Sequence, residues 1–259
     1  MGEFRFKRFT VKNERSAMKV NTDGVLLGAL MTLDRTDRNL LDVGTGTGTI
    51  ALMAAQRLSD MPDAGTSFRI GAIDIDGPSA FEAAENFARS PWSSMLAADN
   101  LSLSAFSERM EVSCREMREK DGNAGDPSAF DLVFSNPPYF ESELKSPDSR
   151  RREARHSESM SYREILHFSA RWLSPCGRCS MILPSETETD LCRYARMCGL
   201  FPFRIVRIRT VPSKPPRRAV VEFSRTRCGE IAEELVTIQE QGRYTERYTD
   251  LMSPFYLKV

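Results

Sequence analysis

The sequence predicts an α/β fold with a mainly parallel sheet of seven strands and an antiparallel pair at one edge. Two observations predict it. Short apolar runs of strand length alternate with segments of helical periodicity, and one strand-to-helix junction is a glycine-rich turn. A length of 259 residues and a hydrophobic content of 41% suit a single domain over 1–259.

Each element follows from its pattern. Apolar residues at helical spacing predict helices over 22–33, 49–58, 78–89, 161–173 and 186–198. Apolar runs of strand length predict strands near 39–43, 69–74, 109–114, 130–135, 178–183, 203–210 and 218–225. Helices between most strands imply right-handed crossovers and parallel pairing. Because only residues 212–216 join the last two strands, these two should pair antiparallel.

The turn after the first of these strands predicts a nucleotide-type cofactor site. Gly44, Gly46 and Gly48 permit a tight turn and a close backbone approach to a ligand at the start of a helix. Two details argue against a nicotinamide or flavin dinucleotide: Thr49 stands where the third glycine of G-x-G-x-x-G belongs, and the Asp42 carboxylate would repel a pyrophosphate. S-adenosylmethionine has no phosphate, and its ammonium group suits Asp42.

The second strand, 69–74, ends in Asp74, an acid placed to accept hydrogen bonds from a ribose diol. The alternative is that Asp74 is only a helix N-terminal acid ahead of Pro78. The strand, turn and helix around it favour the ribose role.

Ser135-Asn136-Pro137-Pro138-Tyr139, at the end of the strand 130–135, predicts alkylation of a planar amino group. Such an amine is a poor nucleophile because its lone pair is delocalised. The Asn136 side-chain oxygen and the Pro137 carbonyl can each accept one N–H, which localises that lone pair. Pro137 and Pro138 restrict the backbone in advance, and Tyr139 offers a flat face for stacking. An isolated Pro-Pro turn would look similar in sequence, but the cofactor turn upstream favours catalysis.

The formal net charge is zero, but basic residues gather in two segments. Residues 203–227 carry eight basic residues against Glu222 alone, and residues 144–155 carry five against two acids. Because the second segment directly follows the amine motif, the pattern favours a phosphate-backbone partner, RNA or DNA. The expected RNA-binding residues are Phe140, Arg150, Arg151, Arg152, Arg155, His156, Arg217 and Arg218.

Several classes of protein are disfavoured. The longest apolar stretch, 24–33, is far too short to span a bilayer, and the N-terminus lacks the apolar core of a signal peptide. A cytoplasmic protein with no membrane partner is therefore expected. The six cysteines are scattered, and Cys176-Gly-Arg-Cys179 has no second pair at zinc spacing. We expect reduced thiols and no metal.

Three stretches resemble the bacterial tRNA valine-1 adenine-N6 methyltransferase family: MKVNTDGVLLG at 18–28, LDVGTGTGTIALMAAQR at 41–57 and SNPPYF at 135–140. The similarity runs along the whole chain. It implies a Rossmann-like class I methyltransferase that uses S-adenosylmethionine. The implied reaction methylates N6 of adenosine 37, just 3′ of the anticodon, in a valine tRNA.

The resemblance also implies roles for residues outside the two motifs. Residues 1–35 would form a segment that closes over the cofactor, and residues 36–259 would form the Rossmann-like core. Within the closing segment, Thr22 would bind the cofactor carboxylate and Lys19 would add charge nearby. Glu116 stands where relatives often carry an aspartate that contacts the adenine amine.

Three alternatives stay open. Release-factor glutamine N5-methyltransferases also carry NPPY, but the arginine-rich segments and the lack of a helical N-terminal domain count against them. Another adenine-N6 or guanine-N2 enzyme acting on ribosomal RNA or DNA would look the same by motif. A non-enzymatic RNA-binding assembly factor would be expected to have lost Asn136 or Asp42, and the sequence keeps both.

Overall fold

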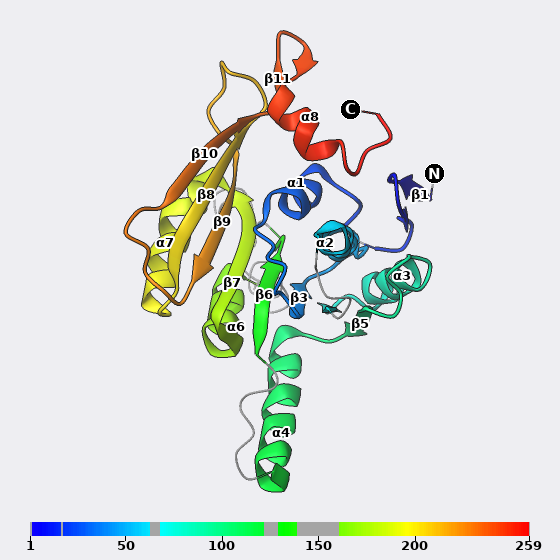
Figure 1. The fold of residues 1–259 in the computed structure, drawn as a ribbon, viewed down its shortest axis with the longest axis vertical. Coiled ribbons are helices and arrows are strands. Elements are labelled where there is room, and N and C mark those ends of the chain that lie inside the picture. The colour runs from blue at the N-terminus through cyan, green and yellow to red at the C-terminus, as the bar shows by residue number, and fades with distance from the viewer. Residues whose placement is uncertain (1, 17, 63–67, 122–128, 139–160, 259) are drawn as a thin grey trace, which may run out of the picture.

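The computed structural model describes residues 2–16, 18–62, 68–121, 129–138 and 161–258. Its centre is an eight-stranded sheet (Figure 1). Every neighbouring pair of strands is parallel except the two pairs that β9 makes. From one edge to the other the strands are β10 (Ala232–Thr237), β8 (Phe201–Arg209), β9 (Arg218–Ser224), β7 (Leu173–Pro184), β6 (Phe130–Ser135), β3 (Asn39–Val43), β4 (Arg69–Asp74) and β5 (Leu96–Asn100).

Helices cover both faces of the sheet. One hydrophobic core includes side chains of α1 (Thr22–Leu30), α2 (Thr49–Asp60), α3 (Gly77–Ala88) and α8 (Glu246–Met252). The other includes side chains of α4 (Leu103–Asp121), α6 (Tyr162–Trp172) and α7 (Glu188–Met197), the last preceded by the short helix η1 (Ser185–Thr187). Neighbouring strand residues alternate between the two cores, as Leu40 and Leu41 do. Two small ribbons pair β1 (Glu3–Arg5) with β2 (Thr10–Lys12) and β11 (Gln239–Glu240) with β12 (Arg243–Tyr244).

Much of the predicted architecture is confirmed. The strands 39–43, 69–74 and 130–135 have the predicted limits, and helices occupy the five predicted regions. The last two predicted strands, β8 and β9, are antiparallel, as expected from their helix-free connection. The sheet nevertheless has an eighth strand, β10, which pairs parallel with β8 and leaves β9 between β7 and β8.

The strand predicted near 109–114 is wrong, because these residues belong to α4. Their apolar neighbours recur at helical spacing, with Phe106, Met110 and Cys114 facing the second core. Val112, the one β-branched residue of 109–114, is half exposed. The third parallel strand is instead β5, whose Leu96-Ala-Ala-Asp-Asn100 has little of the β-branched character typical of strands.

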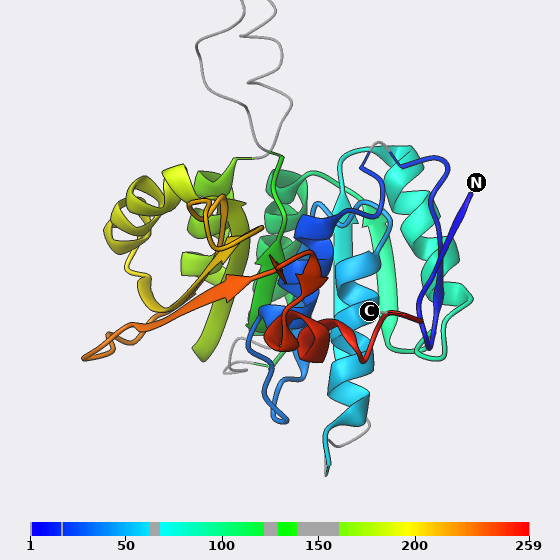
Figure 2. The ribbon, with the colours of Figure 1, turned by 90° about the horizontal axis from the view of Figure 1, so that it is seen from above.

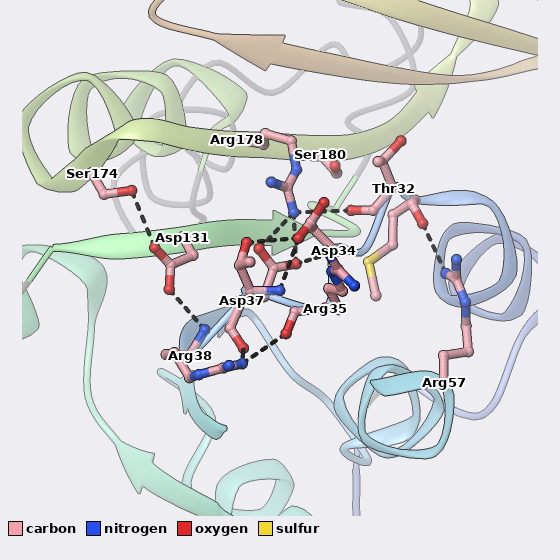
Figure 3. Close-up of polar contacts among 12 residues, drawn as sticks. Thr32, Asp34, Arg35, Asp37, Arg38, Arg57, Asp131, Ser174, Arg178 and Ser180 are labelled. Carbon is pink, nitrogen blue, oxygen red and sulfur yellow. Dashed lines mark hydrogen bonds and ion pairs between the residues drawn. The ribbon is translucent and has the colours of Figure 1, made fainter. Parts of the chain in front are cut away.

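A polar network joins the segment after α1 to the sheet, and Figure 3 shows the part around Arg178 and Asp37. Arg178 donates to both carboxylate oxygens of Asp37, at 2.6 and 2.8 Å. On β9, the fully buried Glu222 accepts hydrogen bonds from the backbone and hydroxyl of Thr32, at 2.7 and 2.9 Å. Arg204 on β8 adds a 2.8 Å ion pair to Glu222. Residues that follow α1 are therefore bonded to strands far away in the sequence.

The N-terminal ribbon packs against residues near the other end of the chain. The Lys7 amide donates to the Phe255 carbonyl at 2.8 Å. The Phe6 ring stacks on those of Phe9 and Tyr256, with centroids 4.5 and 6.0 Å away. Within the described ranges, no helix is long and apolar enough to cross a membrane.

Candidate functional site

The glycine-rich turn lies where β3 ends and α2 begins. Gly44, Gly46 and Gly48 have φ values of 71°, 55° and 79°, a region that side chains disfavour. A Cβ at Gly48 would stand 2.5 Å from the Phe87 ring. This position therefore requires glycine on two independent grounds. The predicted turn is present at the carboxyl end of the parallel strands, where α/β proteins bind ligands.

Asp42 lies behind this turn and is completely buried. One carboxylate oxygen, Oδ2, accepts a 2.8 Å hydrogen bond from the Thr45 hydroxyl, whereas Oδ1 has no donor in good geometry among the described residues. Burial raises the pKa of Asp42 to about 7; the Thr45 bond opposes the rise, and the charge of Asp74 adds to it. A cation brought to this turn would favour the charged form.

The raised pKa of Asp42 predicts a pH-dependent stability. An acid whose pKa is higher in the folded state stabilises the fold below its unfolded pKa, and this contribution is lost as pH rises toward about 7. Without ligand, Asp42→Asn should therefore gain roughly 5–10 °C in thermal midpoint over the unsubstituted protein between about pH 5 and about pH 8.

The matched control for this experiment is Asp34→Asn. Hydrogen bonds from the Thr36 side chain and backbone lower the pKa of Asp34 below its ordinary value of 3.8, so this carboxyl is ionised in both the folded and the unfolded state above about pH 5. The difference between Asp34→Asn and the unsubstituted protein should therefore stay constant from about pH 5 to about pH 8. Scanning calorimetry across pH measures both variants. A difference between Asp42→Asn and the unsubstituted protein that is independent of pH would contradict the buried, proton-binding carboxyl.

Asp74, at the end of β4, contacts the turn directly. Its Oδ2 accepts the Gly46 amide at 2.8 Å, and its Oδ1 accepts the Asp76 amide at 2.9 Å. Burial raises the pKa of Asp74, while these two hydrogen bonds oppose the rise. Two flanking residues that the sequence did not single out shape the same corner. Ile75 is 60% exposed. The side-chain Nδ2 of Asn100 donates to the Asp74 and Ile75 carbonyls, both at 2.9 Å.

Asn136 is brought close to this turn by β6, which lies beside β3. The Ser135 hydroxyl donates to the Val43 carbonyl at 2.6 Å, which links the ends of the two strands. Asn136 is only 5% exposed, and its Nδ2 donates to Met18 Sδ at 3.7 Å. Pro137 is buried and Pro138 is exposed.

Met18 spans the distance between the amine motif and the turn. Its carbonyl lies 3.5 Å from the position of a Cβ at Gly46, and its sulfur contacts Asn136. Nearby, the Lys19 ammonium donates to the carbonyls of Asn13 and Glu14 at 2.7 and 2.8 Å. Thr22 is exposed at the first position of α1. The N-terminal segment therefore borders the predicted site.

The resemblance assigned Glu116 to the adenine of the cofactor. This residue is exposed on α4, in the region where a strand was predicted and a helix is found. The strand that ends beside β4 is β5, so the acid at the corresponding place is Asp99, which pairs with Arg109 at 2.8 Å. The helical apolar spacing of 103–117 was the signal that could have excluded Glu116.

The basic segment 203–227 does not present a uniform positive face. Arg204 pairs with Glu222 and Glu234, and Arg207 pairs with Glu188 and Glu233. Lys214 and Arg217 are exposed in the loop between β8 and β9. This loop lies at the same end of the strands as the glycine-rich turn. Arg218 donates to Asp23 at the start of α1, at 2.7 Å.

Some predicted site residues lie outside the described residues: Tyr139, Phe140, Arg150, Arg151, Arg152, Arg155 and His156. In the part of the chain that is described, no group of three histidine, cysteine, aspartate or glutamate side chains could hold a metal ion. The candidate site is thus built from Asp42, the turn, Asp74 and Asn136.

Comparison with known proteins gives full-length relatives. The chain is 39% identical over 256 residues to a tRNA1(Val) (adenine(37)-N6)-methyltransferase of Bacteroides fragilis, covering 99% of this chain and 98% of that protein. A protein of the same name from Parabacteroides distasonis is 38% identical, with the same coverage. No family model matches. Among solved structures, a predicted O-methyltransferase from Agrobacterium tumefaciens shares the fold, with a TM-score of 0.57, 16% identity, and coverage of 90% of this chain and 96% of that one.

Proposed function

Because the chain belongs to the tRNA1(Val) (adenine(37)-N6)-methyltransferase family, we infer that it methylates N6 of adenosine 37 in valine tRNA with S-adenosylmethionine. One observation carries the proposal beyond sequence similarity. Met18 bridges the glycine turn and Asn136, so a cofactor at the turn and an amine at Asn136 would be neighbours. Transfer of a methyl group requires this proximity.

The residues present fit S-adenosylmethionine. The buried Oδ1 of Asp42 lacks a well-placed donor among the described residues, as expected of a carboxyl group that pairs with a cationic ligand. Asp74 retains acceptor capacity for a ribose diol beyond its two backbone hydrogen bonds. Exposed Ile75 offers an apolar surface for an adenine ring. The family resemblance adds Thr22 and Lys19, and Lys19 directly follows Met18, which lies against the turn.

The bound cofactor supplies an electrophilic methyl group on a sulfonium. The protein's task is to orient the amine. Asn136 Oδ1 and the Pro137 carbonyl would each accept one N–H of the adenine amino group, which would localise its lone pair for methylation. As the new N–C bond forms, the C–S bond to the methyl group would break, and the resulting cationic nitrogen would lose one of its protons to water, so no strong base is needed beforehand. The motif predicts that Tyr139 would stack the extruded base, which is easily displaced from a single-stranded anticodon loop.

The tRNA backbone would pass over the carboxyl ends of the parallel strands, where the glycine-rich turn lies. Exposed Lys214 and Arg217 lie at this end of the strands, whereas Arg204 and Arg207 form ion pairs with carboxylates. Lys214→Ala combined with Arg217→Ala should weaken tRNA binding and flatten the slope of log affinity against log salt by roughly one unit for each phosphate that is no longer neutralised. Fluorescence anisotropy over a salt series measures the slope.

Arg115→Ala combined with Arg196→Ala is the matched control for this pair. It removes the same charge from exposed positions on α4 and α7. These helices cover the face of the sheet opposite α1 and α2, so the slope should stay unchanged. Equal slopes for both double variants would place the RNA elsewhere.

The proposed function is tested by supplying labelled S-adenosylmethionine with separate pools of unmodified tRNA, ribosomal RNA, DNA and release factor. We expect label in tRNA, recovered as N6-methyladenosine at position 37 of a valine isoacceptor. Preferential labelling of release factor would replace the proposal with glutamine methylation. Labelling of ribosomal RNA or DNA would keep the chemistry and change the substrate.

A further inference from the structure

Helix α3 presents a buried polar face to the N-terminal segment that borders the site. Ser79, Glu82 and Asn86 lie on this face and are at most 2% exposed. Residues 13–16, which follow β2, pass beside α3 (Figure 2). A helix that packed by apolar contacts alone would not need three buried polar side chains here.

Glu82 binds this segment with its whole carboxylate. Oε1 accepts the amides of Glu14 and Arg15, at 2.7 and 2.9 Å, and Oε2 accepts the Ser16 amide at 2.9 Å. Burial opposes the charged form, but these three amides outweigh it and lower the pKa of Glu82. Three successive amides on one carboxylate fix the local backbone more firmly than side-chain contacts would.

The hydrogen bonds continue from Glu82 toward the reaction centre. The Ser16 hydroxyl contacts the Ser79 hydroxyl at 2.9 Å and donates to the Met18 carbonyl at 3.0 Å. Met18 in turn lies against Gly46 and receives the Asn136 Nδ2 hydrogen bond. Beside them, Asn86 donates to the Thr47 carbonyl at 2.9 Å, which holds the turn to the same helix.

We propose that Glu82 is a positioning residue that fixes residues 14–16, so that Met18 closes the space between the cofactor turn and Asn136. The cofactor would bind tightly only when this segment is held. This inference rests on the proposed function for the identity of the cofactor. It assigns to α3 a role in cofactor affinity in addition to packing.

The test compares Glu82→Gln with Glu85→Gln on the same helix. Glutamine matches the shape of Glu82 but replaces one acceptor oxygen with a donor facing an amide, so S-adenosylmethionine should bind about ten-fold more weakly. At saturating cofactor, kcat should stay within about three-fold of the unsubstituted enzyme, because Asn136 is untouched. Glu85, which pairs with Lys12 and Arg15 at the surface, should have little effect on either quantity when replaced.

A second measurement separates positioning from general stability. In Glu82→Gln, the amides of residues 14–16 should exchange with solvent faster, while the amides of α2 keep their protection. If this variant does not fold, Ser16→Ala decides, because it removes the hydroxyl contacts to Ser79 and to the Met18 carbonyl, leaves the bond from Ser79 to Asp76 in place, and should weaken cofactor binding by a few-fold.

Unchanged cofactor affinity in the folded variant would overturn the role of Glu82 even if the unsubstituted enzyme methylates tRNA. Failure of the unsubstituted protein to bind S-adenosylmethionine would instead overturn the proposed function. The two failures are therefore distinguishable by calorimetry on the unsubstituted protein.

Discussion

Replacing Asn136 with alanine should lower methylation turnover by a factor of about 10²–10³ while leaving S-adenosylmethionine affinity nearly unchanged. The variant lacks one of the two acceptors that localise the amine lone pair. The turn, Asp42 and Asp74 stay in place, because the link between β6 and β3 runs through Ser135 rather than Asn136. Single-turnover assays with saturating tRNA give the rate, and calorimetry gives the affinity.

Asn39→Ala serves as the control for this substitution. Asn39 begins β3, at the opposite end of the sheet from the site, and donates to the Ala129 carbonyl at 3.1 Å. Its replacement should affect stability more than turnover. Near-normal turnover of Asn136→Ala would show that the amine is oriented by other groups.

Asp74→Ala should weaken S-adenosylmethionine binding by about 10- to 100-fold. Two effects combine: the charged acceptor for the ribose diol disappears, and the Gly46 amide is deprived of the partner that holds the turn. Asp74→Asn, which keeps one acceptor oxygen and the side-chain shape, should fall between alanine and the unsubstituted protein.

Titration calorimetry on the three proteins measures this effect, with exposed Asp250→Ala as a control for a missing surface charge. Because Asp74 does not contact the amine motif in the described residues, kcat at saturating cofactor should change far less than affinity. Identical affinities for all variants would mean that the ribose is bound elsewhere.

The parts of the fold that could be predicted from the sequence are those that local patterns determine. The strand 39–43 is buried on both faces, so it appears in the sequence as an apolar run. Position 48 requires glycine, because its φ is positive and a side chain there would clash with the Phe87 ring. The Asn136 motif follows a strand of the same kind. These features bring Asp42, Asp74 and Asn136 together at the carboxyl ends of neighbouring parallel strands.

The remaining features depend on contacts between distant residues. Strand β10 buries only Val236 fully, so its sequence carries little strand signal. Counting charges over 203–227 could not reveal that Arg204 and Arg207 face carboxylates on other elements. Glu82 looks like one more helix surface acid until the fold places residues 14–16 against it.

The bond between Lys7 and Phe255 orders events during synthesis of the chain. The N-terminal ribbon leaves the ribosome first, but its partner emerges after every strand of the central sheet. Residues 14–16 can bind Glu82 as soon as α3 has folded, but the ribbon that precedes them gains its contact with Phe255 only after that residue has emerged. The Glu82 contacts and the docking of the ribbon through Lys7 and the Phe6–Tyr256 stack are therefore separate events, the first possible well before the second.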